Sequence, residues 1–258
     1  GSSGNGSYGG AVSLNINWYD SGYKRAPAYI KNSTFHGNYI KTLSSSNNGN
    51  MFGAAIAHAE WDAADQKTYI FNTIITGSRV MVDTSDLDVS NLNSNQKKML
   101  IVGEGNTGNN KLTMDHSNVQ ASTLGTGWGD YVYNITSAYN DTSNNDYSLS
   151  SKSPLIGGGV ASWDDEDLSA PTEDLLGSAR PNPSGSNPDL GAYENSLGSS
   201  SAPMPVSDLV VKRGSSSAKL SWSKVVEKLG SSTEATGITY RIYQGGSMVD
   251  STTANSYT

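Results

Sequence analysis

Three side chains of this 258-residue sequence could act as acid–base groups. Lys31 and Arg79 are of the type that abstracts a proton during β-elimination from a uronic-acid polysaccharide, and His36 could exchange protons near neutral pH. Hydrolysis of a glycosidic bond would instead need two paired carboxylates, and the sequence shows no stacked aspartate pair. These three residues are therefore the catalytic candidates, with solvated surface charges as the alternative.

The densest run of charge suggests a cation site. Trp163 is followed by the four carboxylates Asp164-Asp165-Glu166-Asp167, which repel one another unless they are solvated or bridged by a cation. Asp164, Asp165 and Asp167 are thus candidate ligands for Ca²⁺, although their spacing is not that of an EF-hand. A solvated acidic loop remains the alternative, and no cofactor is required.

Aromatic residues point to a carbohydrate. Aromatic rings can stack on the apolar face of a sugar while nearby Asn and Asp side chains bind its hydroxyls. The candidates for such a site are Trp18, Tyr19, Trp61 and Trp128. The alternative is that these rings cap loops and pack on the body of the protein.

Composition excludes several classes of protein. The chain has no cysteine, so disulfide frameworks, Cys-ligated zinc and thiol nucleophiles are excluded. With 17 Lys+Arg against 24 Asp+Glu, it does not have the basic character of a nucleic-acid-binding protein. No stretch of 18 apolar residues would insert into a membrane. The 28 glycines and the abundant Ser and Asn suit an all-β protein with many turns.

Internal repeats indicate how these side chains are positioned. Residues 9–14 resemble residues 53–58, and residues 28–38 resemble residues 68–78, with a weaker third copy at 111–120. Val12, Leu14 and Ile16 alternate with polar residues, which is the period of a strand. We interpret the 40 to 44-residue period as two stacked rungs of roughly 20–22 residues each.

The recurring "GGAV" and "IKNSTFHGN" patterns resemble a right-handed parallel β-helix of the pectin-lyase-like type. In that family, a strand-ending Asn points inward and binds the backbone of a tight turn; Asn32 and Asn72 match it. His116 takes this place in the third copy, so we expect the ladder of asparagines to end there. His58 aligns with the inward Leu14, which favours a packed, hydrogen-bonded histidine over a catalytic one.

Residues 144–195 resemble the choice-of-anchor Q module, which closes many bacterial surface β-helix proteins. The match rests on Asp146-Tyr147, Ser153-Pro154-Leu155-Ile156-Gly157, Arg180-Pro181 and Asp189-Leu190-Gly191-Ala192-Tyr193-Glu194, although the family often has Asp where Gly157 stands. The resemblance implies that Arg180 and Asp189 pair, or bind backbone, to hold the C-terminal wrap.

Residues 204–258 resemble a fibronectin type III domain, with Trp222 as its core tryptophan and Tyr240-Arg241-Ile242-Tyr243 as its third strand. Such domains need seven strands over roughly 100 residues, so we expect this one to be truncated by two strands. The first residue is not Met and the end falls in a strand-like pattern, so we expect a piece of a longer protein.

We therefore predict an all-β chain with rungs at 1–127, a closing module at 128–195, a flexible linker at 196–203 and a truncated fibronectin domain at 204–258. The rungs hold 9 basic and 9 acidic residues, whereas the closing module holds 2 basic and 11 acidic residues.

The predicted function is polysaccharide binding or adhesion, non-catalytic in this region, by a secreted or cell-surface bacterial protein. The alternative is a polysaccharide lyase or other carbohydrate-active enzyme. We expect a monomer that binds a cell-surface glycan, without nucleic acid or membrane insertion.

Overall fold

The protein is all-β. The computed structural model describes residues 10–15, 27–42, 53–59, 67–82, 85–86, 88, 101–105, 112–120, 131–198, 202–206, 208–229 and 231–258. Two 3-10 turns, η2 (Thr142–Asn144) and η3 (Asp164–Glu166), interrupt the strands.

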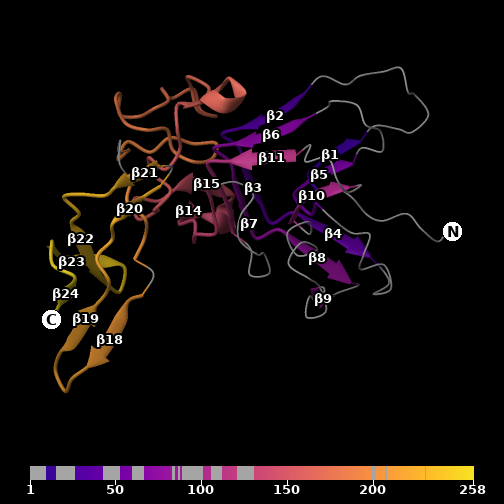
Figure 1. Cartoon of the computed structure of the whole chain (residues 1–258). Helices are drawn as coiled ribbons and strands as arrows, with labels where there is room; N and C mark the ends of the chain where they lie inside the picture. Colours follow the sequence, from indigo (N-terminus) through magenta and orange to yellow (C-terminus); the bar gives the residue numbers. More distant parts are fainter. Residues whose placement is uncertain are drawn as a thin grey trace.

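Three sheets take one strand from each of the three sequence repeats, and a fourth takes one strand from each of the first two (Figure 1). The first three are β1-β5-β10 (Val12–Asn15, Ile56–Ala59, Val102–Gly105), β2-β6-β11 (Ala28–Lys31, Thr68–Phe71, Leu112–Asp115) and β3-β7-β12-β13 (Thr34–His36, Ile74–Thr76, Ser117–Gln120, Val132–Tyr133). The fourth is β4-β8-β9 (Tyr39–Thr42, Arg79–Val82, Ser85–Asp86). All neighbours are parallel except β8 and β9.

The strand registers confirm the repeat alignment and correct its period. Val12 lies opposite Ile56, and Ala28 lies opposite Thr68, at offsets of 44 and 40 residues. Because these strands are immediate neighbours, one period is a single turn of chain that contributes a strand to each of four sheets. The prediction of two rungs per period was therefore wrong.

Inward side chains form continuous apolar stacks through the parallel sheets. Alternate residues of each strand point to the same face, so registered strands place like side chains above one another. The stacks are Val12-Ile56-Val102, Ile30-Ile70-Met114, Phe35-Ile75-Val119 and Ile40-Val80. Full burial of each Val or Ile contributes roughly 1.5–3 kcal/mol, so the stacks hold the sheets together.

The corner between the second and third sheets explains the recurring Asn. Asn32, Asn72 and His116 have φ of 43°, 49° and 43°, a left-handed conformation that Asn and His adopt more readily than most residues. The Asn72 amide nitrogen donates to Asn32 Oδ1 at 3.4 Å, which confirms a ladder between these two residues. His116 instead stacks on Tyr131, with ring centroids 4.7 Å apart.

The closing segment, residues 131–198, packs on the parallel strands through two apolar clusters. One joins Ile74 to Leu155 and Leu190, and the other joins Tyr69 and Phe71 to Trp163. Besides β13 and the two 3-10 turns, its regular structure consists of the short hairpins β14–β15 (Tyr139–Asp141, Asp146–Leu149) and β16–β17 (Ser162–Trp163, Leu168–Ser169). Most of this segment is therefore held by side chains rather than by ladder bonds.

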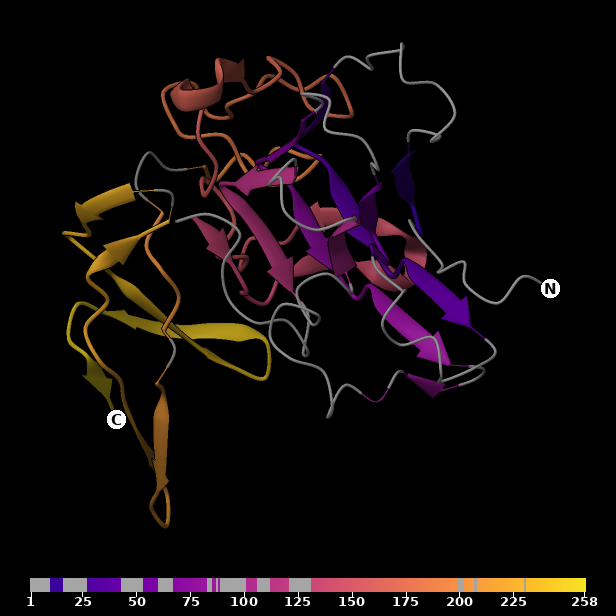
Figure 2. The ribbon, with the colours of Figure 1, turned by 45° about the vertical axis from the view of Figure 1, so that its right-hand side comes forward.

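The C-terminal unit, residues 202–258, lies to one side of the parallel strands (Figures 1 and 2). Its sheets are β18-β19-β24 (Val210–Arg213, Ala218–Ser221, Ser256–Tyr257), β20-β21 (Glu227–Lys228, Ser231–Glu234) and β22-β23 (Tyr240–Gln244, Ser247–Thr252). The tryptophan predicted for its core, Trp222, is 6% exposed and packs on Tyr240 at a centroid distance of 5.0 Å.

The predicted flexible linker ends in packed structure. Ala202 is 3% exposed, and its carbonyl accepts a hydrogen bond from the Leu229 N–H at 2.8 Å. From the closing segment, Lys152 Nζ donates to the Gly246 carbonyl at 2.8 Å and lies 5.0 Å from the Tyr243 ring centroid. Ala202, near the end of the predicted linker, is therefore already packed against the C-terminal unit.

Candidate functional site

The three catalytic candidates lie in three different sheets. Lys31 ends β2, and its Nζ donates to the Ser169 carbonyl at 2.9 Å. His36 ends β3, where its Nδ1 lies 2.9 Å from Thr76 Oγ1, and Arg79 begins β8 with an exposed side chain. The structure does not gather them on one face, as a lyase site would require.

The predicted sugar-binding aromatics Trp18, Tyr19, Trp61 and Trp128 lie outside the described residues. Of the predicted calcium ligands, Asp164 and Asp167 are exposed, and the side chain of Asp165 is also outside the described part. Where side chains are described, no three His, Asp or Glu groups are placed to hold a metal ion. The calcium site stays a prediction.

A pair of stacked tyrosines occupies the outer face of the β2-β6-β11 sheet. Tyr29 and Tyr69 are registered partners, and their rings are stacked with centroids 5.6 Å apart and planes 9° apart. Tyr29 is 51% exposed, whereas Tyr69 is 8% exposed. Because β2 is the edge strand of this sheet, the pair presents an open aromatic ring beside a covered one.

The closing segment sets the surroundings of this aromatic pair. Trp163 packs edge-on against Tyr69 at 6.2 Å, and Lys67 Nζ lies 6.0 Å from the Tyr69 ring centroid. Burial, together with a hydrogen bond and the charge of Glu166, raises the pKa of Tyr69 to about 12. Tyr69 is therefore an uncharged ring that supports Tyr29 from below. A basic residue, Lys67, and an acidic residue, Glu166, lie beside it.

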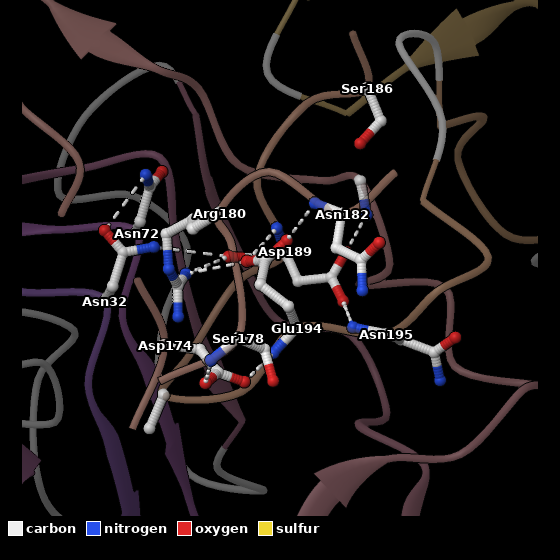
Figure 3. Close-up of polar contacts among 12 residues, drawn as sticks. Asn32, Asn72, Asp174, Ser178, Arg180, Asn182, Ser186, Asp189, Glu194 and Asn195 are labelled. Atoms are coloured by element: carbon white, nitrogen blue, oxygen red, sulfur yellow. Dashed lines mark hydrogen bonds and ion pairs between the residues drawn. The ribbon is translucent and has the colours of Figure 1, made fainter. Parts of the chain in front are cut away.

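A buried charge cluster lies in the closing segment (Figure 3). Arg180 Nη1 lies 3.0 Å from Glu194 Oε1, with side chains 1% and 0% exposed. The same Nη1 donates to the Asp189 carbonyl at 3.2 Å. Arg180 thus contacts Asp189 through the backbone and forms its ion pair with Glu194, and the role of Arg180 and Asp189 in holding the C-terminal wrap stays a prediction.

The carboxylate of Asp189 ties two distant parts of the closing segment together. Its Oδ1 accepts the Gly157 N–H at 2.6 Å, and its Oδ2 accepts the Asn195 N–H at 2.7 Å. Burial raises the pKa of Asp189 to about 7, against the effect of these two donors, and the charge of Glu194 adds to the rise. Burial also raises the pKa of Glu194, opposed mainly by Arg180.

The asparagine ladder binds this cluster to the parallel strands (Figure 3). Asn72 Nδ2 donates to the Val160 carbonyl at 2.7 Å, and Asn72 Oδ1 accepts the Val160 N–H at 3.1 Å. Asn32 Nδ2 donates to the Asp189 carbonyl at 3.3 Å. Gly191 has φ +89°, and its N–H donates to the Asn72 carbonyl at 2.8 Å, where a Cβ would clash with Ile74. The ladder of Asn32 and Asn72 therefore attaches the closing segment to the parallel strands.

Sequence reasoning found part of this arrangement. The packed role of His58 is confirmed, since it is 1% exposed and its Nδ1 lies 2.7 Å from Thr68 Oγ1. The stacking of Tyr29 on Tyr69 was missed, although the 40-residue offset already aligned them. Glu194 was missed as the partner of Arg180; the available signal was that residues 128–195 hold only two basic residues, Lys152 and Arg180, among many acidic ones.

Comparison of the chain with protein-family models, curated proteins and solved structures found no match. Within the described ranges, no helix is long and apolar enough to cross a membrane. The function must therefore be argued from the outer tyrosine pair and the buried cluster.

Proposed function

We propose that residues 1–127 are turns of a right-handed parallel β-helix and that residues 128–195 close it as a choice-of-anchor Q type module. Parallel sheets that take one strand from each repeat support this architecture. For residues 204–258 we propose a truncated fibronectin type III domain, supported by antiparallel strands around the buried Trp222.

The function we propose is binding of a polysaccharide by a secreted or cell-surface bacterial protein, without catalysis in this region. The observation that carries it is the half-exposed Tyr29, stacked on Tyr69 on the outer face of the β2-β6-β11 sheet. An exposed aromatic ring on a rigid support matches the flat, apolar face of a pyranose ring.

The expected contribution of Tyr29 follows from its free area. A buried aromatic side chain covers roughly 150–250 Å², and about half of Tyr29 is exposed. Covering that half at about 25 cal/mol per Å² contributes roughly 2–3 kcal/mol as an upper estimate. Loss of the ring should therefore weaken binding by at most about 30- to 160-fold.

The test is binding of the chain to a panel of neutral and uronic-acid polysaccharides, comparing Tyr29→Ala with Tyr39→Ala. Tyr39 is a matched control because it is 55% exposed on β4, in a different sheet. We expect binding that Tyr29→Ala weakens and Tyr39→Ala leaves unchanged. Equal binding by both variants and the unaltered chain would refute the tyrosine site. Release of an unsaturated product, abolished by Lys31→Ala or Arg79→Ala, would favour the lyase instead.

A further inference from the structure

The β18–β19 hairpin projects from the rest of the C-terminal unit, with β18 as the edge strand of its sheet (Figures 1 and 2). β18 pairs with β19 alone, and all four of its residues are exposed. Three consecutive apolar residues, Leu209, Val210 and Val211, are 54%, 49% and 53% exposed. An exposed apolar edge strand is a template on which another strand can pair, so soluble proteins usually cover or interrupt such an edge.

The hydrogen-bond pattern of this hairpin shows which backbone groups of β18 remain open. The Gly214 N–H donates to the Ser217 carbonyl at 2.7 Å, so these two opposed residues form a hydrogen-bonded pair. Bonded and non-bonded pairs alternate along an antiparallel ladder, and β18 and β19 pair without a bulge. Val211 and Arg213, three residues and one residue before Gly214, therefore have their N–H and C=O groups on the open edge rather than toward β19.

The two faces of β18 differ in character. Val211 lies opposite the half-buried Leu220, on the face that turns toward the core of the unit. Lys212 lies on the other face, directly opposite Lys219, and both lysines are exposed. Like charges placed directly opposite each other destabilise a strand pair. Neither lysine has an acidic partner among the described residues, so this face lacks carboxylates that an added strand could supply.

These features together define a ligand. We propose that β18 binds an extended segment of another protein as an added strand, with apolar side chains on the Val211 face and carboxylates on the Lys212 face. The open backbone groups of Val211 and Arg213 hold the segment in place, as in other cases of strand addition to a sheet edge. A second copy of β18 fits less well, because it would bring the cations of both copies into one interface. This binding does not depend on the proposed glycan site.

Binding of short synthetic peptides to the full chain tests this proposal. The probe is an acetylated and amidated peptide of alternating valine and glutamate, and the control peptide has lysine in place of glutamate. We expect the glutamate peptide to bind, more weakly as the salt concentration rises, and the lysine peptide not to bind. Hydrogen exchange followed by NMR should show that the bound peptide protects the N–H groups of Val211 and Arg213. Absence of binding by the glutamate peptide, or equal binding of both peptides, would overturn the proposal.

Two substitutions of Val211 separate strand addition from simple attraction of charge. Val211→Pro removes the N–H on the open edge without breaking a bond to β19, and Pro is tolerated at such positions of edge strands. It should weaken binding by at least about fivefold, which corresponds to one backbone hydrogen bond, whereas Val211→Thr keeps the N–H and should bind within about twofold of the unaltered chain. If Val211→Pro disrupts the hairpin, protection of the Val211 N–H in the unaltered chain decides.

Substitution of a lysine tests the charged face. Lys212→Gln should weaken binding and lower its salt dependence, while Lys224→Gln, which removes an exposed lysine outside the hairpin, should change neither. Binding that is unchanged in Val211→Pro would assign the peptide to the lysines alone and refute strand addition. Self-association of the chain in sedimentation, abolished by Val211→Pro, would show a second copy to be the occupant and would equally refute the proposal.

Discussion

Removal of the Arg180 side chain should destabilise the closing segment more strongly at neutral pH than at acidic pH. Arg180→Ala leaves Glu194 buried at 0% exposure without its cation. Breaking a buried ion pair from one side costs about 3–5 kcal/mol, because the remaining charge is uncompensated. The loss of the hydrogen bond from Arg180 to the Asp189 carbonyl adds about 1 kcal/mol.

Protonation of Glu194 limits this cost and makes it depend on pH. An unpaired Glu194 can take up a proton, and from its ordinary pKa of 4.5 this costs about 3 kcal/mol at pH 7 but less than about 1 kcal/mol at pH 5. The free energy of unfolding should therefore fall by about 4 kcal/mol at pH 7, and by roughly 2–3 kcal/mol less at pH 5. At pH 7 the melting temperature should fall by about 10 °C.

Urea unfolding at the two pH values, followed by tryptophan fluorescence, measures these differences. Arg241→Ala, which removes an exposed arginine from β22, is the matched control and should cost less than about 0.5 kcal/mol. Arg180→Ala/Glu194→Gln removes the unpaired charge and should recover about half of the loss. An Arg180→Ala variant as stable as Arg241→Ala, or a loss that is equal at pH 5 and pH 7 and is not rescued, would refute the reasoning.

Two further predictions concern the ladder and the C-terminal unit. Asn72→Ala should lower the free energy of unfolding, measured in urea, by about 3 kcal/mol, because it leaves both backbone groups of Val160 unpaired and places Ala at a positive φ. The control Asn140→Ala removes an exposed amide and should lower it by under about 1 kcal/mol. Equal losses in the two variants would contradict this prediction. Trp222→Ala should cost about 3–5 kcal/mol. Trp222→Phe should cost much less, since Trp222 Nε1 has no hydrogen-bond partner to lose. Hydrogen exchange should show the loss in residues 204–258 alone, and loss of protection in the closing segment would contradict this.

The parallel strands could be predicted from the sequence because the distance between two copies of a repeat gives the register in which their strands pair. A constant offset of 40 residues places Ile30 on Ile70 and Asn32 on Asn72, so a motif read once applies to the next turn. The same offset could not show that one period is a single turn. One period could be a single turn with four strands or two rungs of half that length. Both arrangements give the same spacing of apolar residues along the chain, and only the pairing of the strands distinguishes them.

The closing segment was less predictable because it does not repeat. Its contacts join residues far apart in sequence, such as Asn72 with Val160 and Asn32 with Asp189, at separations of 88 and 157 residues. Resemblance to a module drew attention to Arg180 and Asp189. Which carboxylate pairs with the guanidinium depends on the path of the backbone between them, and this path has almost no regular structure.

The acidity of residues 128–195 first suggested a bound cation, and the structure gives much of it a different use. Among the carboxylates that the structure describes in this segment, five accept backbone N–H groups, namely Asp141, Asp146, Asp174, Asp189 and Glu194. A segment with few ladder bonds must satisfy its N–H groups through side chains, and a carboxylate can accept several of them. The negative charge is therefore in large part the means by which an irregular segment is fixed in its own conformation, whereas its attachment to the strands uses the neutral amides of Asn32 and Asn72.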